Sequence, residues 1–111
     1  MASPDTDSYL PLSPAMFHVL VSLADEERHG YAILKEIADR TSGRIKLSTG
    51  TLYGIINRLL ADGLVVDRTT RDDRRLYKLT AFGREVARAE AARLEELAAM
   101  ARATRALRSP I

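Results

Sequence analysis

The sequence predicts a mainly α-helical chain with one small β-hairpin and a long C-terminal helix. Three observations support this fold class. Apolar residues recur at helical spacing in three segments between residues 13 and 63, two β-type runs surround a charged turn near residue 72, and residues 81–108 contain no helix breaker. The length of 111 residues suits one domain, and the 46% hydrophobic content is enough for a core.

The first helix is predicted to begin at Ser13 and Pro14. A serine hydroxyl can cap the helix, and proline is tolerated at its first position. Residues 1–12 contain Ser, Asp and two prolines without periodicity, so we expect them to form a flexible N-terminal arm. The apolar residues of the first helix are Phe17, Leu20, Val21 and Ala24.

The second helix is predicted from Gly30 to the left-handed cap at Gly43, and the third from Ser48, its cap, to Gly63. The alternating segment 44–47 between them could form one short strand. The second helix has an apolar stripe of Tyr31, Leu34, Ile37 and Ala38. The third turns Leu52, Ile56, Leu59 and Leu60 inward.

The hairpin is predicted from the runs "LVVDRTT" and "RRLYKLT" on either side of "RDD". Thr80 can then cap a final helix over residues 81–108. Three helices followed by a two-stranded ribbon make a winged helix-turn-helix, which we assign to residues 13–80.

Charge is distributed unevenly along the chain, although the net charge is only +2. Residues 1–43 carry three basic and seven acidic residues, whereas residues 44–80 carry eight basic and four acidic ones. This arrangement favours a polyanion-binding face in the central segment. Alternatively, the charge blocks are ordinary solvated surface.

The third helix contains two glycines, Gly50 and Gly54, each of which costs about 1 kcal/mol of helix stability relative to alanine. They lie four residues apart and therefore share a face. The third helix of a winged helix-turn-helix enters the major groove with its N-terminus, where such a face lets backbone approach DNA. The DNA-binding residues predicted here are Ser48, Thr49, Gly50, Thr51, Tyr53 and Asn57. Alternatively, the glycines allow close helix packing in the core.

The hairpin adds Arg71, Arg74 and Arg75 at or beside its tip, where a wing meets phosphates or the minor groove. We expect Arg74, Arg75 and Lys78 to bind DNA. Two aspartates in the turn partly neutralise this cluster, and turns also collect charge simply because solvent surrounds them.

The last helix would be on the order of 40 Å long at 1.5 Å per residue and would project beyond a small domain. A projecting helix with an apolar seam needs a partner helix. The seam residues predicted to mediate dimerisation are Leu94, Leu97, Ala98 and Ala101. Alternatively, the helix folds back onto its own domain.

Several classes of function are disfavoured. The absence of Cys excludes disulfides and thiolate metal sites, and no metal or cofactor is expected. No phosphate loop or catalytic triad motif occurs, so an enzyme is not expected. His29 is more typical of a helix cap than of a base. No apolar run reaches membrane-spanning length and no signal peptide is evident, so we expect a cytoplasmic protein without membrane association.

Three blocks of the chain resemble the PadR family of bacterial transcriptional regulators. They are "HGYAILKEI", "STGTLYGIINRLLADGLV" and "RRLYKLTAFGR", and they occur in the family's order and spacing. The resemblance implies a homodimeric winged helix that represses genes and is often relieved by a small aromatic or hydrophobic ligand. The wing lacks the glycine that many relatives carry, and the chain has no Trp with which to sandwich a planar ligand.

These observations together predict a sequence-specific transcriptional regulator that binds double-stranded DNA at a pseudo-palindromic operator. We expect a homodimeric repressor whose binding a small hydrophobic or aromatic effector relieves. The alternative is a winged helix that binds an acidic protein partner and has no specific affinity for DNA.

Overall fold

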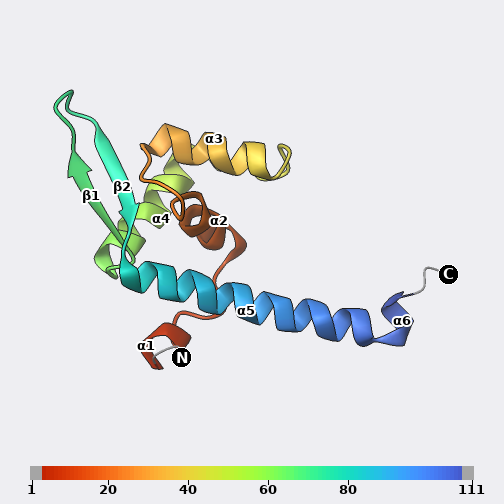
Figure 1. Ribbon diagram of the computed structural model, residues 1–111. Coiled ribbons are helices and arrows are strands. Elements are labelled where there is room, and N and C mark those ends of the chain that lie inside the picture. Colours follow the sequence, from red (N-terminus) through yellow and green to blue (C-terminus); the bar gives the residue numbers. More distant parts are fainter. Residues whose placement is uncertain (1–3, 109–111) are drawn as a thin grey trace.

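A computed structural model describes residues 4–108 and confirms the predicted fold class, which is mostly helical with one antiparallel hairpin and a long C-terminal helix (Figure 1). The elements in chain order are α1 (Pro4–Asp7), α2 (Pro14–Ser22), α3 (Gly30–Arg40), α4 (Thr49–Ala61), β1 (Val65–Thr69), β2 (Arg75–Leu79), α5 (Ala81–Ala103) and α6 (Arg105–Arg108).

The predicted capping residues begin the three helices as expected. The hydroxyls of Ser13, Ser48 and Thr80 accept hydrogen bonds from the amides of Met16, Thr51 and Gly83, respectively. Each bond satisfies a first-turn amide that has no partner within its helix. Gly43 and Gly63 have positive φ angles of 78° and 76°, so both serve as the left-handed terminators that the sequence predicts.

The core lies where α2, α3 and α4 meet the base of the hairpin and the first half of α5. Val65 pairs with Leu79 in the first register position, and both are buried in this core together with Tyr77 from the middle of β2. The fully buried side chains include Leu20, Ile33, Ile37, Leu52, Ile56, Leu59, Leu64 and Val86.

The face that the second helix turns inward matches the predicted stripe in part, since Ile37 is buried and Leu34 packs against the core as predicted. Ile33 and Ile37 are buried, whereas Tyr31 is 75% exposed. The prediction is wrong for Tyr31, because the buried face begins at Gly30 and continues through Ile33. The predicted strand at 44–47 is also wrong. That segment has no partner strand among the described residues, and its Ile45 and Leu47 pack on the core instead.

The long helix α5 passes beneath the bundle and projects beyond it, which gives the molecule extents of 56 × 34 × 22 Å (Figure 1). At its start Gly83 lies so close to Leu64 that an added Cβ would overlap the carbonyl oxygen of Leu64. The prediction of one unbroken helix to residue 108 is wrong. The helix ends at Ala103, because Thr104 adopts an extended conformation (ψ 113°) and separates α5 from α6.

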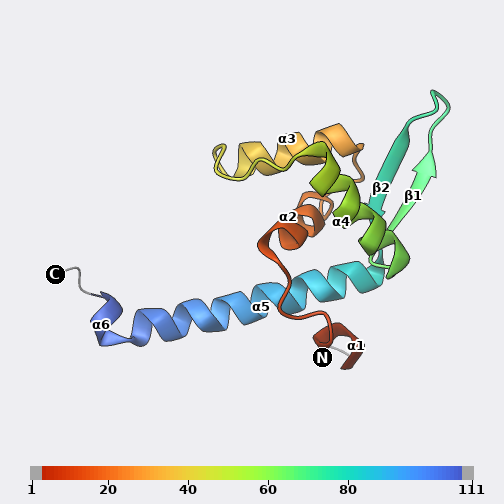
Figure 2. The ribbon, with the colours of Figure 1, turned by 180° about the vertical axis from the view of Figure 1, so that it is seen from behind.

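The N-terminal segment wraps around α5, so that α1 lies on the opposite side of α5 from the helical bundle (Figure 2). We predicted a flexible arm over residues 1–12, but its described part packs against the domain. Leu12 is buried, and the Tyr9 ring meets the Phe82 ring edge-on at 5.7 Å between centroids. Apolar burial outweighs the weak local propensity of the segment. Residues 1–3 lie outside the described part.

Candidate nucleic-acid interface

The outward face of α4 carries the residues predicted to bind DNA. Ser48, Thr49, Gly50, Thr51 and Asn57 are all exposed. At the start of the helix, the Ser48 hydroxyl accepts from the Thr51 amide and donates to the Thr51 hydroxyl (2.9 Å). Exposed hydroxyls therefore stand at the N-terminus of α4, and a helix N-terminus with hydroxyl donors beside it favours phosphate.

The two glycines of α4 contact nothing across the helix face. A Cβ added at Gly50 or at Gly54 would have no neighbour within 4 Å in the described chain. The alternative that these glycines allow close packing in the core is therefore wrong. Their helix-weakening effect has no compensation inside the molecule, which leaves a bare strip of backbone on the exposed side of α4.

Tyr53 differs from its neighbours on α4. Its side chain is 40% exposed, and its ring lies over the N-terminus of α3, where an added Cβ at Gly30 would overlap the Tyr53 hydroxyl. Tyr53 was predicted to face a DNA groove, but only part of its side chain is exposed. The other part makes this contact, which joins α3 and α4 at the edge of the exposed face. The sequence signal for it is the glycine of the "HGY" stretch.

The wing is a five-residue ribbon on each side of a tight turn. The Thr70 amide donates to the carbonyl of Arg74 (2.7 Å), and Asp73 takes the left-handed position (φ 61°). Aspartate tolerates this conformation better than most residues, so the turn closes without glycine. The Thr70 hydroxyl bonds the Asp72 carboxylate and lowers its pKa.

The basic residues of the wing differ in how strongly they are neutralised. Among residues 4–108, Arg74 and Lys78 make no ion pair, and both are exposed. Arg75 lies 3.4 Å from the Asp67 carboxylate across the ribbon. Arg68 forms a two-pronged pair with Glu27 (2.6 and 3.2 Å), and this bond lowers the pKa of Glu27.

Besides the Arg68–Glu27 pair, two contacts to strand β2 hold the wing against the rest of the domain, and neither was predicted from the sequence. Arg28 and Tyr77 exchange backbone hydrogen bonds in both directions (3.1 and 2.9 Å). One residue further on, His29 reaches the carbonyl oxygen of Arg75. The partners lie 46 or more residues apart, and no short-range pattern signals them.

The predicted dimerisation residues lie on the projecting part of α5. Leu94, Leu97, Ala98 and Ala101 are all exposed, with Leu97 at 45%. Two exposed apolar residues were not predicted to belong to this row: Met100, which is 59% exposed on the same helix, and Leu107 on α6. An exposed apolar row of this length is unusual for a monomer in water.

Glu90 of α5 is a charged residue that is only 2% exposed. Its carboxylate accepts from the Leu12 amide (3.1 Å) and from the guanidinium of Arg93 (2.5 and 3.0 Å). The hydrogen bonds from Arg93 lower its pKa, and the Leu12 amide acts in the same direction. Because the N-terminal segment covers Glu90 from outside α5, helical periodicity gave no sign of this burial.

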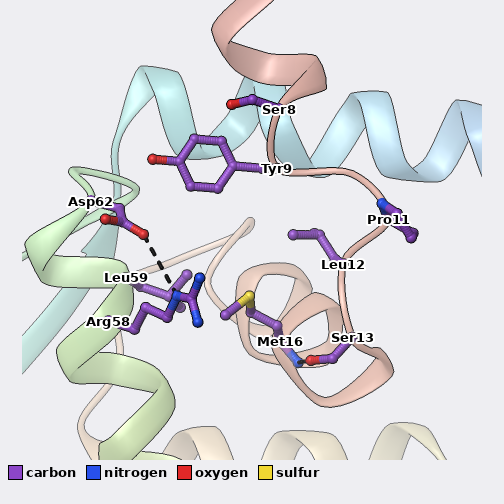
Figure 3. Close-up of a pocket in the computed structure, with 9 residues that line it drawn as sticks. All are labelled: Ser8, Tyr9, Pro11, Leu12, Ser13, Met16, Arg58, Leu59 and Asp62. Carbon is purple, nitrogen blue, oxygen red and sulfur yellow. Dashed lines mark hydrogen bonds and ion pairs between the residues drawn. The ribbon is translucent and has the colours of Figure 1, made fainter.

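A hollow of about 360 Å³ separates the N-terminal segment from the end of α4 (Figure 3). Tyr9 lies on one side of it and Arg58 on the other, with Met16 and Leu12 between them. Arg58 is only loosely paired, since its Nε lies 3.8 Å from the Asp62 carboxylate. The hollow therefore combines apolar surface with an accessible guanidinium.

No cluster of side chains within residues 4–108 could hold a metal ion. In the same described range, no helix is both long and apolar enough to span a bilayer.

Comparison with known proteins identifies the family. The model of the "Transcriptional regulator PadR-like family" matches residues 19–89, which include α3, α4 and the whole wing. The chain belongs to the PadR-like family. This PadR-like protein is accordingly a transcriptional regulator, and the family is one of regulators rather than of enzymes.

Individual relatives agree with this assignment. The chain is 38% identical over 84 residues to the transcriptional regulator Rv3488 of Mycobacterium tuberculosis, an alignment that covers 73% of this chain and 76% of the relative. A PadR family transcription regulator from Clostridium difficile has the same fold, with a TM-score of 0.71 and 18% identity over 79% of this chain and 94% of that one.

The fold also matches Bacillus subtilis PadR, solved in complex with operator DNA. The TM-score is 0.62 and the identity 20%, over 69% of this chain and 46% of that one.

Proposed function

We propose that this PadR-like regulator is a homodimeric repressor that binds double-stranded DNA with sequence specificity. The carrying observation is the open strip at Gly50 and Gly54, because a helix gives up stability there without any internal gain. A DNA backbone or base edge at that strip would supply the missing contact. The hydroxyls of Ser48, Thr49 and Thr51 flank it as phosphate donors.

In this proposal the N-terminal turns of α4 enter the major groove, and the wing contacts the flanking backbone. Arg74, Arg75 and Lys78 would bind phosphates, while Asn57 lies further along α4 to reach a base edge or the opposite strand. The protein acts in the cytoplasm, where it meets the operator.

The exposed row on α5 supports a homodimer. Leu94, Leu97, Ala98 and Ala101 would be covered by the same residues of a second copy, as closed symmetric dimers require. Two copies of α4 spaced about 34–36 Å apart would engage successive major grooves of a pseudo-palindromic operator.

The proposal also includes relief of repression by a small aromatic or hydrophobic effector. The hollow beside α4 has a suitable size and mixed lining, and it borders Arg58 and Leu59 of the helix proposed to bind DNA (Figure 3). A molecule held there would bear directly on the position of α4.

Selection of bound duplex from a random pool, followed by titration of the selected operator, tests the main proposal. We expect a pseudo-palindromic consensus and an affinity that falls steeply with salt, with a slope of about −0.9 per neutralised phosphate. Repression is then tested with a reporter gene placed behind that operator. If the pool yields no consensus while the protein binds an acidic protein partner, the winged helix serves protein contacts instead.

A matched pair of variants sharpens this test. Arg74→Ala should weaken operator binding and reduce the salt slope by about one, because it removes a phosphate contact. Arg102→Ala removes the same charge from the far end of α5 and should leave the slope unchanged. Equal effects of the two variants would mean that only the net charge of the protein matters, and this would contradict the proposed role of the wing.

A further inference from the structure

His29 occupies the position before the first residue of α3, but its side chain does not cap that helix. Instead its Nδ1 lies 2.7 Å from the carbonyl oxygen of Arg75, which is in strand β2 of the hairpin. A carbonyl oxygen only accepts, so the hydrogen of this bond must be carried by Nδ1. The His29 ring therefore donates a hydrogen bond to the backbone of the wing.

The location of the bond on the wing is informative. Arg75 is the first residue of β2 and pairs with Thr69, the last residue of β1, so this is the ladder position next to the turn. The Arg28–Tyr77 backbone bonds attach the ribbon two residues closer to its base. Glu27 holds Arg68 of the other strand, so among these contacts of the described chain the His29 bond is the one made at the ladder position next to the turn.

A two-stranded ribbon has little stability of its own, and its orientation depends on what it is tied to. The tie at residues 28–29 leads straight into Gly30, the residue on which the Tyr53 ring of α4 rests. The N-terminus of α3 therefore contacts both surfaces proposed to meet DNA, namely α4 through Tyr53 and the wing through His29.

We propose that His29 is a positioning residue that sets the distance between Arg75 of the wing and α4. Its Nδ1–H holds the backbone at Arg75, so that the Arg75 side chain reaches a phosphate while α4 occupies the adjacent groove. This inference rests on the proposed DNA-binding function. It assigns to the histidine of the "HGY" stretch a role that requires no contact between its ring and DNA.

The first test uses the wild-type protein alone and does not depend on DNA binding. Nitrogen-15 NMR of the His29 ring, recorded at a pH where it is neutral, distinguishes the two tautomers. The proposal requires the hydrogen on Nδ1. A neutral ring with its hydrogen on Nε2 cannot donate to the Arg75 carbonyl and would overturn the inference, whatever the protein's activity.

The second test uses His29→Ala and His29→Asn with the selected operator, or with random duplex if no consensus emerges. Asparagine carries an amide nitrogen at the branch position that Nδ1 occupies in histidine, so it keeps the donor. We expect His29→Ala to weaken binding about two- to tenfold, the usual effect of one hydrogen bond, and to lower the salt slope by about one. His29→Asn should restore both values to within twofold of the wild type.

Coupling to Arg75 separates positioning from a general structural effect. In an Arg75→Ala background, His29→Ala should change neither the affinity by more than twofold nor the slope, because the contact that it positions is already absent. Additive losses in the two backgrounds would contradict the proposal. Should His29→Ala fail to fold, the tautomer measurement still decides whether Nδ1 donates to Arg75, and a loss of affinity or of salt slope in His29→Asn would contradict the proposal.

Discussion

The Tyr53 hydroxyl lies over Gly30 so closely that no side chain larger than hydrogen fits at position 30 without displacing the ring. This relationship joins the first turn of α3 to the exposed face of α4. Glycine at position 30 therefore serves a neighbour's side chain rather than an unusual backbone conformation. The ring in turn receives a fixed orientation at the border of the surface proposed to bind DNA.

Gly30→Ala should therefore disturb Tyr53 without unfolding the domain, because the overlapping atoms belong to the end of a movable side chain. We expect a nearly unchanged melting temperature and a loss of operator affinity similar to that of Tyr53→Ala. Titration of both variants, with circular dichroism to follow melting, checks this. Wild-type affinity in Gly30→Ala would mean that the ring position is irrelevant to binding.

Gly54→Ala should have opposite effects on stability and on function. An added methyl group meets nothing in the protein and improves helix propensity, so the domain should gain about 0.8–1 kcal/mol. The same methyl group would stand between α4 and DNA, so operator binding should weaken. Chemical denaturation and a binding titration measure the two effects separately, and Ala61→Gly, at the C-terminal end of α4, is a control in which stability falls while binding is retained.

Glu27→Gln should strengthen DNA binding. The substitution keeps the shape of the side chain but releases Arg68 from its ion pair, so one more cation of the wing becomes available for a phosphate. Affinity at low salt should rise, and the salt slope should steepen by up to about one. Glu96→Gln makes the same change of charge on the outer half of α5, and an equal gain in that variant would refute the specific role of the pair.

Glu90 makes stability depend on pH in a predictable direction. Because Arg93 and the Leu12 amide lower its pKa in the folded state, its contribution is present above the ordinary value of 4.5 and is lost as pH falls through the lowered value. Glu90→Gln should cost about 1.5–3 kcal/mol at pH 7. The difference from wild type should shrink towards acid pH, and a constant difference would show that the charge is not what matters.

Leu97→Glu should give a monomer if the seam on α5 is the dimer interface. A charge at this position would be buried without a partner in each copy, which disfavours association strongly. Operator affinity should fall from the range of about 10⁻⁸–10⁻¹¹ M towards 10⁻⁴–10⁻⁶ M, because a single half-site is bound. Light scattering gives the mass, and Ala92→Glu, another exposed position of α5, is the matched control.

The helices and the hairpin could be predicted from the sequence because their signals are local. Ser13, Ser48 and Thr80 each cap a helix within three residues of their own position, and Leu52, Ile56 and Leu59 repeat at helical spacing. The open strip at Gly50 and Gly54 follows from the same spacing. These parts of the fold require no knowledge of distant segments.

The contacts that assemble the surface could not be predicted in this way. Leu12 and Glu90 are 78 residues apart, and His29 and Arg75 are 46 residues apart. Helical periodicity gives no sign that Glu90 is buried, because the segment that covers it comes from the other end of the chain. Tyr31 was assigned to the core for a related reason, since hydrophobicity alone does not show which face of a short helix meets the bundle.

The helix α5 is enclosed on two sides, by the bundle and the base of the hairpin on one and by the N-terminal segment on the other. Its start is fixed further by the contact of Gly83 with the Leu64 backbone. Because packed interiors deform little, a rotation of the outer end of α5 is transmitted to the domain that carries α4. The outer end of α5 and the exposed face of α4 therefore move together. In a dimer, a different spacing between half-sites could then be accommodated by substitutions along the outer half of α5, with the DNA-contacting residues unchanged.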